Sequence, residues 1–181
     1  MSFKDIYGQD RQIAVLQRTV ACGRLPHAYL FYGMKGIGKK TTAVALAKTL
    51  NCKDGGADAC DSCAVCRKID HGNHPDIFFI RPEGIFIKIE EIRKLQSQAK
   101  YRPFEGRKRV FIIEDAERLN IPAANALLKT LEEPGPSNIL ILTTSRPYVI
   151  LPTIISRCQK IRFSPLRRDI IVAFLMERRM L

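Results

Sequence analysis

The sequence predicts an α/β fold, a parallel β-sheet with helices on both faces, and three observations lead to it. Five short apolar runs alternate with stretches of helical periodicity. The runs are apolar throughout rather than at every second residue, which is typical of parallel strands buried on both sides. The first run ends in a glycine-rich turn, and a helical pattern follows at once. The chain therefore passes from strand to loop to helix.

Local patterns predict the elements in chain order. A helix at about 9–22 is expected because Ile13, Leu16 and Val20 recur at helical spacing and Gly23 follows as a stop signal. The apolar runs predict strands at 27–32, 77–80, 110–113, 139–142 and 161–163. Further helices are predicted at 41–50, 88–100, 120–133 and 167–180.

The composition is that of a compact, basic chain. Its 181 residues are 46% hydrophobic and carry a formal net charge of +12, so a core can form without disulfides. The basic excess lies in residues 1–50 and 151–181, which fits contact with a polyanion or, equally, a solvated basic face. No apolar run approaches the roughly 20 residues of a membrane span. The first ten residues lack an apolar signal segment, so we expect a cytoplasmic protein.

The glycine-rich turn has the pattern of a phosphate-binding loop. Its glycines let successive backbone N–H groups face a phosphate, and the lysine that follows reaches the terminal phosphates. These residues are Gly33, Gly36, Gly38 and Lys39. The next position normally holds a hydroxyl that binds Mg²⁺, but here Lys40 occupies it and Thr41 comes about 100° further round the helix. We expect weak binding of ATP or ADP; the alternative is a glycine turn without a ligand.

A pair of acids follows the run at 110–113. In phosphate-loop NTPases an Asp at this strand end holds Mg²⁺, and a following acid can polarise the attacking water. Here Glu114 precedes Asp115, which inverts the usual order and changes the reach of each side chain by one methylene. A displacement of about 1 Å can reduce a rate on the order of 10²-fold. Together with Lys40, this inversion predicts that the chain hydrolyses ATP poorly or not at all.

Four cysteines lie close together in the sequence. They are Cys52, Cys60, Cys63 and Cys66. Their spacing lets four thiolates converge on one tetrahedral ion, and a reducing compartment favours metal binding over disulfides. We predict a structural Zn²⁺ site in a module at about 51–70, with buried free thiols and a redox pair as alternatives. Cys22 and Cys158 are expected to be packing residues, and His27, His71 and His74 to be structural or solvated.

Further motifs carry a family resemblance. They are Tyr7-Gly8-Gln9, the run from His27 to Phe31, the segment from Asn125 to Pro134, and Ser156-Arg157-Cys158. With the loop and the cysteines, they resemble the clamp-loader branch of the AAA+ ATPases. The departures at Lys40 and Glu114-Asp115 favour its delta-prime family in bacterial DNA polymerase III, because the related gamma/tau subunits resemble working ATPases.

The resemblance implies a fold, partners and a role for one arginine. It implies a five-stranded AAA+ domain at 1–165 with the phosphate-binding loop at the centre of the sheet, and the start of a helical lid at 166–181. Its partners would be gamma/tau and delta subunits, a sliding clamp and primed-template DNA, with no membrane. Arg157, a weak signal alone, is implied to reach the ATP site of a neighbouring subunit as an arginine finger.

Two other functions stay open from the sequence. The first is a gamma/tau-type subunit that hydrolyses ATP itself. The second is a zinc-dependent DNA-binding module whose phosphate-binding loop is vestigial.

Overall fold

Five parallel strands form a single sheet in a computed structural model that describes residues 1–177. The strands are β1 (Ala28–Tyr32), β2 (Ile77–Ile80), β3 (Arg109–Ile113), β4 (Asn138–Thr144) and β5 (Gln159–Arg162). Their order across the sheet is β2-β3-β4-β1-β5, and every neighbouring pair is parallel. The first strand thus lies between two strands that come last in the chain, which places the loop after it in the inner part of the sheet.

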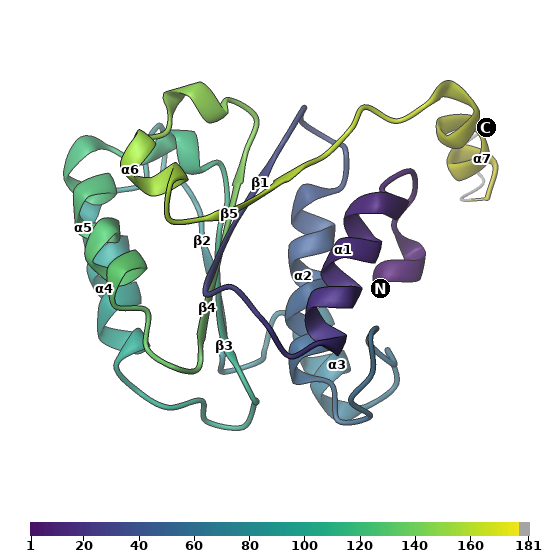
Figure 1. Cartoon of the computed structure of the whole chain (residues 1–181), viewed down its shortest axis with the longest axis horizontal. Coiled ribbons are helices and arrows are strands. Elements are labelled where there is room, and N and C mark those ends of the chain that lie inside the picture. Colours follow the sequence, from purple (N-terminus) through teal and green to yellow (C-terminus); the bar gives the residue numbers. More distant parts are fainter. Residues whose placement is uncertain (178–181) are drawn as a thin grey trace.

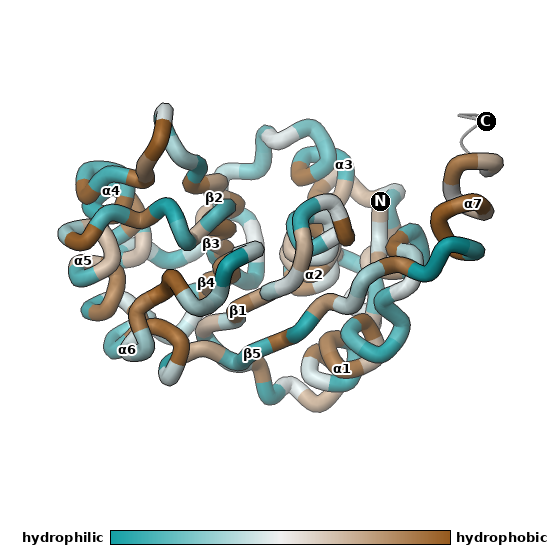
Figure 2. Tube along the Cα trace, turned by 90° about the horizontal axis from the view of Figure 1, so that it is seen from above, coloured by the Kyte–Doolittle hydropathy of each residue, from teal (hydrophilic) through white to brown (hydrophobic). Residues whose placement is uncertain are grey.

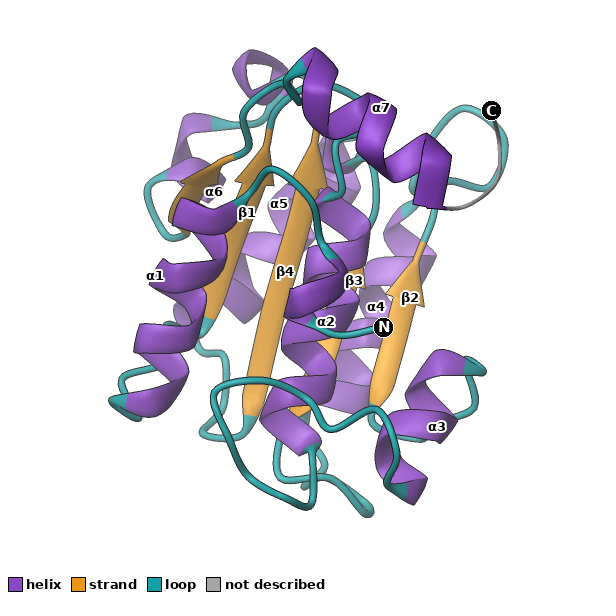
Figure 3. Ribbon diagram, turned by 90° about the vertical axis from the view of Figure 1, so that its right-hand side faces the viewer, coloured by secondary structure: helices purple, strands orange, loops and turns teal. Residues whose placement is uncertain are grey.

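Helices cover both faces of this sheet (Figure 1). On one side lie α1 (Asp10–Ala21), α2 (Lys39–Asn51) and α3 (Ala64–Asp70). The other side carries α4 (Ile89–Ala99), α5 (Ile121–Glu132) and α6 (Pro152–Ile155). A last helix, α7 (Arg168–Glu177), lies beyond the carboxyl ends of the strands (Figure 3). Among the described residues, no helix has the length and apolar character that crossing a membrane requires.

The core has two halves, one on each face of the sheet. Alternate residues of a strand point to opposite faces, so Tyr29 and Phe31 pack towards α1 and α2 whereas Leu30 packs towards α4 and α5. Every residue of β3 and β4 is buried. Figure 2 shows hydrophobic residues along these inner strands and hydrophilic residues on the outer loops. Only Ile161 of the edge strand β5 is buried.

The predicted fold class is confirmed, with differences at the ends of elements. All five strands and the long helices occur where the sequence predicts them, within about two residues. The short helices α3 and α6 were not predicted, and residues 178–180 of the last predicted helix lie outside the described residues. The division into a domain at 1–165 and the start of a lid at 166–181 stays a prediction.

The expectation that both unclustered cysteines are packing residues was correct for Cys158 and wrong for Cys22. Cys158 is buried, and burial raises the pKa of its thiol to about 12. Cys22 is exposed instead of packed, because it lies just after the last residue of α1, in the exposed turn that leads to β1.

Candidate functional site

The loop between β1 and α2 has the geometry of a phosphate cradle. Gly33 has φ +148°, and a Cβ there would lie 2.6 Å from the carbonyl oxygen of Phe163, so only glycine fits. Gly38, with φ +93°, turns the chain directly into α2. In the described part of the chain, the backbone N–H groups of residues 34–36 and 38 donate to no backbone oxygen. The positive end of the α2 dipole faces the same place, so the loop suits an anionic group.

Lys39 lies across this loop. Its Nζ donates to the carbonyl oxygens of Gly33 at 2.8 Å and Met34 at 2.5 Å, and the residue is only 9% exposed. Burial lowers the pKa of Lys39, while the negative charges of Glu117 and Asp115 partly oppose that change. The ammonium group is therefore already placed at the cradle.

A hollow lies beside the loop. It has a volume of about 300 Å³ and is lined by apolar Ile6, Ile37 and Leu166 together with Tyr7 and Thr41. This volume is at the small end of the range for ligand pockets, about 300–1,000 Å³. The predicted site residue Thr41 thus contributes to the wall of the hollow.

Gln9 ties the two chain segments beside this hollow together. Its side chain, which is fully buried, donates to the carbonyl oxygen of Ser164 at 2.8 Å and accepts the N–H of the same residue at 3.1 Å. The sequence marked Gln9 only as part of a motif, because its partner lies 155 residues away.

The place where a phosphate-loop enzyme holds Mg²⁺ contains an ion pair. The Nζ of Lys40 lies 3.1 Å from Oε1 of Glu114. Arg81, which directly follows β2, brings its Nε to 2.7 Å from the same oxygen. Asp115 has φ +50°, a strained conformation for a residue with a side chain. A magnesium ion does not fit this arrangement, since the hydroxyl ligand is replaced by a cation and the carboxylate is already paired.

A third acid, Glu117, was missed by sequence reasoning. Its carboxylate is buried and accepts hydrogen bonds from the Ser145 hydroxyl at 2.7 Å and the Ser145 N–H at 3.2 Å. Burial raises its pKa, but these hydrogen bonds outweigh that effect and keep the pKa low. Glu117 thereby joins the segment after β3 to the end of β4. Its only sequence signal was its position two residues after Asp115.

The four clustered cysteines form a metal-binding geometry. Their sulfur atoms all lie within 4.8 Å of one another, and those of Cys60 and Cys66 are 4.0 Å apart. Four sulfurs around a tetrahedral zinc, each at about 2.3 Å, lie about 3.8 Å from one another. Backbone N–H groups at 3.3–3.5 Å donate to the sulfurs of Cys52, Cys60 and Cys63, which favours thiolates. The cluster therefore fits Zn²⁺.

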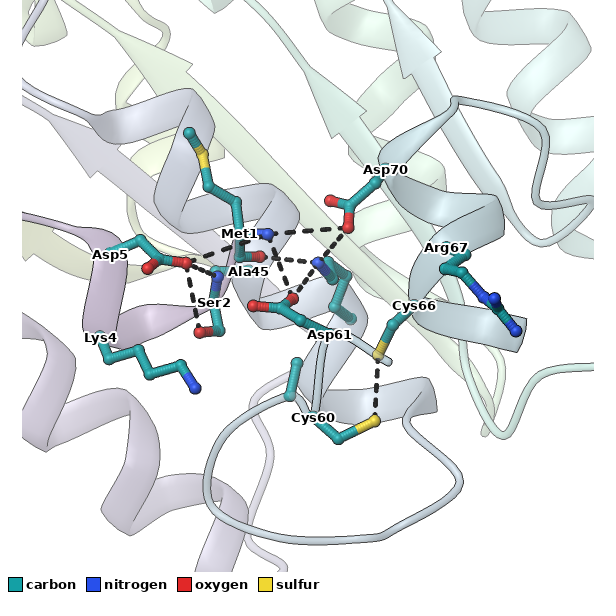
Figure 4. A network of polar contacts seen from close by, with 12 residues as sticks. Met1, Ser2, Lys4, Asp5, Ala45, Cys60, Asp61, Cys66, Arg67 and Asp70 are labelled. Atoms are coloured by element: carbon teal, nitrogen blue, oxygen red, sulfur yellow. Dashed lines mark hydrogen bonds and ion pairs between the residues drawn. The ribbon is translucent and has the colours of Figure 1, made fainter. Parts of the chain in front are cut away.

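A buried lysine connects this cluster to α2 and to the amino terminus (Figure 4). Lys48, which has no exposed surface, donates to the carbonyl oxygen of Met1 at 2.8 Å and to Asp70 at 2.6 Å, and it pairs with Asp61. The Met1 amino group lies 3.2 Å from Asp61. Because Asp61 directly follows Cys60, the network fixes the cysteine loop against α2.

Arg157 lies on the opposite face of the sheet from α2. It follows α6, and its Nη2 donates to Oε1 of Glu132 at 2.6 Å while its Nη1 donates to the carbonyl oxygen of Thr153 at 2.9 Å. Glu132 is the last residue of α5. The segment from Asn125 to Pro134 and the Ser156-Arg157-Cys158 motif thus meet in space.

The structure therefore brings together most, but not all, of the predicted site residues. The loop glycines, Lys39, Lys40, Thr41, Glu114 and Asp115 gather at the carboxyl ends of β1 and β3. The cysteines form a second centre at the other end of α2, and Arg157 stands apart from both.

A comparison with protein families decides the relationship. The family described as "DNA polymerase III, delta subunit" matches residues 8–167. The chain belongs to this clamp-loader family. Its predicted membership of the AAA+ clamp loaders is thereby confirmed.

Comparison with individual members of the clamp-loader family supports the same relationship. The chain is 43% identical over 169 residues to the DNA polymerase III subunit delta' of Bacillus subtilis, covering 93% of this chain and 51% of that protein. It is 39% identical over 171 residues to the tau subunit of the same organism, covering 94% of this chain and 30% of tau. The chain thus spans about half the length of the delta' relative and less of tau.

Solved structures show the same fold. A DNA polymerase III gamma subunit-related protein of Thermotoga maritima superposes with a TM-score of 0.62 at 24% identity, covering 87% of this chain and 47% of that one. The RuvB Holliday junction branch migration motor of the same organism gives a TM-score of 0.65 at 15% identity, covering 96% and 51%. At these identities the likeness supports the AAA+ fold alone.

Proposed function

We propose that this chain is a delta-prime-type subunit of a bacterial clamp loader, which helps to load a sliding clamp onto primed DNA in the cytoplasm. Its partners would be gamma/tau and delta subunits, the clamp and the primed template. The family match and the delta', tau and gamma relatives support a place in such an assembly. The finer assignment depends on the two sites of the chain itself.

The observation that carries the assignment is the ion pair between Lys40 and Glu114. Hydrolysing phosphate-loop enzymes use Mg²⁺ to bridge the phosphates and neutralise developing charge. In this chain the position of the metal-binding hydroxyl holds an ammonium group. The proposed subunit therefore binds nucleotide weakly and hydrolyses it poorly or not at all.

Arg157 is the residue through which such a subunit would act on a neighbour. The planar guanidinium can stabilise charge on a transferred phosphoryl group. Its partner Glu132 is 52% exposed and Arg157 itself 36%. Exposed ion pairs contribute only about 0–1 kcal/mol, so a phosphate of an adjoining subunit can replace Glu132 as the partner.

The four-cysteine cluster would hold a structural Zn²⁺. Four thiolates close the tetrahedron and leave no position for a reacting water. Bound metal would order the loop between α2 and α3, and no catalytic step is assigned to it.

ATP turnover by the purified chain tests the absence of hydrolysis. We expect a rate no higher than that of a Lys39→Ala variant, which removes the loop lysine and serves as the matched background. The B. subtilis tau subunit, measured alongside, serves as the comparison. Turnover that requires Lys39 and reaches ~1 s⁻¹, the lower end for ordinary enzymes, would support the alternative, a gamma/tau-type ATPase.

A further inference from the structure

The site that departs furthest from its fold class is the magnesium position. Lys40 follows the loop lysine on α2, and Glu114 follows the last residue of β3. One carboxylate oxygen of Glu114 receives Lys40 at 3.1 Å and Arg81 at 2.7 Å. Arg81 is itself held over the Phe79 ring, 5.2 Å from its centre. Lys40 of α2 and Arg81 at the end of β2 thus converge on one oxygen atom of Glu114, at the end of β3.

Magnesium demands oxygen ligands at about 2.0–2.1 Å in near-octahedral geometry. Lys40 offers no oxygen, and an ion bound by Glu114 would face two positive groups at close range. Neither neighbouring hydroxyl takes the missing place. Thr41 lies about 100° further round the helix, and the Thr42 hydroxyl donates to the carbonyl oxygen of Gly38 at 2.8 Å. The site therefore lacks a hydroxyl for the metal, and the acid that faces Lys40 is already paired.

The charge of the missing ion is nevertheless present. Mg²⁺ would bring two positive charges, and Lys40 and Arg81 together bring the same number. These two side chains are about half exposed, whereas Glu114 is only 18% exposed. The two cations line a solvent-open hollow of about 560 Å³, which shares Thr41 with the hollow beside the phosphate-binding loop, and they neutralise the acid between them.

We propose that the phosphate-binding loop of this chain takes a nucleoside diphosphate or inorganic pyrophosphate without a metal ion, with Lys40 and Arg81 supplying the charge that Mg²⁺ supplies elsewhere. The inference deepens the proposed function and rests on its phosphate-binding loop, but it is independent of Arg157. It explains why loss of the metal-binding hydroxyl and inversion of the acids occur together. Each of the two departures supplies one partner of the same ion pair.

Titration calorimetry with ADP and with inorganic pyrophosphate tests this inference. The buffer is freed of divalent ions by a resin before the protein is added, because a soluble chelator would also compete for a cysteine-bound metal. Binding is then compared with and without added MgCl₂. We expect Mg²⁺ to tighten neither ligand by more than about threefold, where tenfold corresponds to about 1.4 kcal/mol.

A double variant provides the converse test. Lys40→Thr with Glu114→Asp restores a hydroxyl and a shorter acid, so Mg²⁺ should tighten its ADP binding by about tenfold or more. With ADP present, protein-bound Mn²⁺ should be visible by electron paramagnetic resonance in this variant and absent in the wild type. Lys94→Thr with Glu91→Asp makes the same two changes in an ion pair on α4 and should behave like the wild type.

Three results would overturn the inference. They are tightening of wild-type binding by Mg²⁺ beyond about threefold, no binding of ADP or pyrophosphate in either buffer, and a folded double variant that binds ADP without gaining magnesium dependence. The wild-type comparison needs no substitution, so it stands even if the double variant does not fold. Failure here leaves the clamp-loader role intact, because that role is tested through Arg157 in the assembled complex.

Discussion

Asp76 shows how much a single residue can organise in this chain. The carboxylate is fully buried at the start of β2 and accepts the backbone N–H groups of Phe104, Glu105 and Gly106 at 2.7–2.9 Å. It also accepts a hydrogen bond from Arg109 at 3.0 Å. Burial raises its pKa, but these donors outweigh burial and keep the pKa below its usual value. One side chain thus fixes the loop between α4 and β3.

Replacing Asp76 by Asn should therefore destabilise the fold strongly. Removing one partner of a buried pair costs about 3–5 kcal/mol, which urea unfolding at pH 7 would measure. The folded pKa is lowered, so this stabilisation is complete above the unfolded pKa of about 3.9 and is lost as pH falls through the folded value. The difference in the free energy of unfolding between the wild type and the variant should therefore become smaller only below about pH 4.

The control for this prediction is Asp54→Asn, which changes an exposed aspartate and should alter stability by no more than about 0.5 kcal/mol. The wild type and Asp76→Asn could instead differ in free energy of unfolding by the same amount at pH 7 and at pH ~3.5. That result would show that the charge of Asp76 does not contribute to stability.

At the level of elements, the sequence predicted what local patterns determine. Strands such as β2 were found at the predicted residues because a continuous apolar run is typical of a parallel strand that is covered on both faces. The short helices were missed: α3 has seven residues and α6 has four, too few for a periodic pattern. Helices of this length depend on tertiary contacts rather than on propensity.

The same distinction applies to the candidate site. Its loop and cysteine cluster could be predicted because their residues are neighbours in the chain. Gln9, Arg81 and Glu117 could not, because their partners lie 155, 33 and 28 residues away. Only the parallel sheet, which gathers strand ends at one edge, brings such residues together.

The cysteine loop as an element should contain one zinc ion per chain. Metal analysis of protein purified without chelator should return one equivalent, and Cys63→Ser should lose it while Cys22→Ser, at an exposed cysteine outside the cluster, retains it. Because Cys52 directly follows the last residue of α2, removal of the metal should also loosen the end of that helix. A loss of about 2 kcal/mol would lower the thermal midpoint by about 4–8 °C. Less than half an equivalent of zinc in the wild type would contradict the assignment.

Across the whole molecule, the sheet separates the two surfaces for which we propose a role. The phosphate-binding loop leads into α2, whereas Arg157 contacts Glu132 of α5 and Thr153 of α6. These two helices lie on the other face of the sheet from α2 (Figure 1). Arg157 is therefore not positioned to serve the loop of its own chain. A subunit with this arrangement is suited to presenting the arginine to an adjoining subunit.

The proposed role predicts a loss of function that appears only in the assembly. Arg157→Ala in the full-length protein should leave folding and zinc content unchanged. In a reconstituted loader, total DNA-stimulated ATPase should fall partially, because only one of several ATP sites would face this arginine. Clamp loading should fall further, since it needs the sites to act together. Arg157→Lys should restore little, because an ammonium group lacks the planar fork of the guanidinium.

The most direct test measures ATP hydrolysis and clamp loading side by side in loaders that contain wild type, Arg157→Ala or, as a matched control, Arg24→Ala. Arg24 is an exposed arginine in the loop between α1 and β1. An arginine supplied in trans accelerates phosphoryl transfer about 10³-fold or more in GTPases, so one silenced site should be measurable. We predict that Arg24→Ala equals the wild type and that Arg157→Ala is deficient in both assays. Equal rates for all three proteins would contradict the account and leave Arg157 as a solvated surface residue.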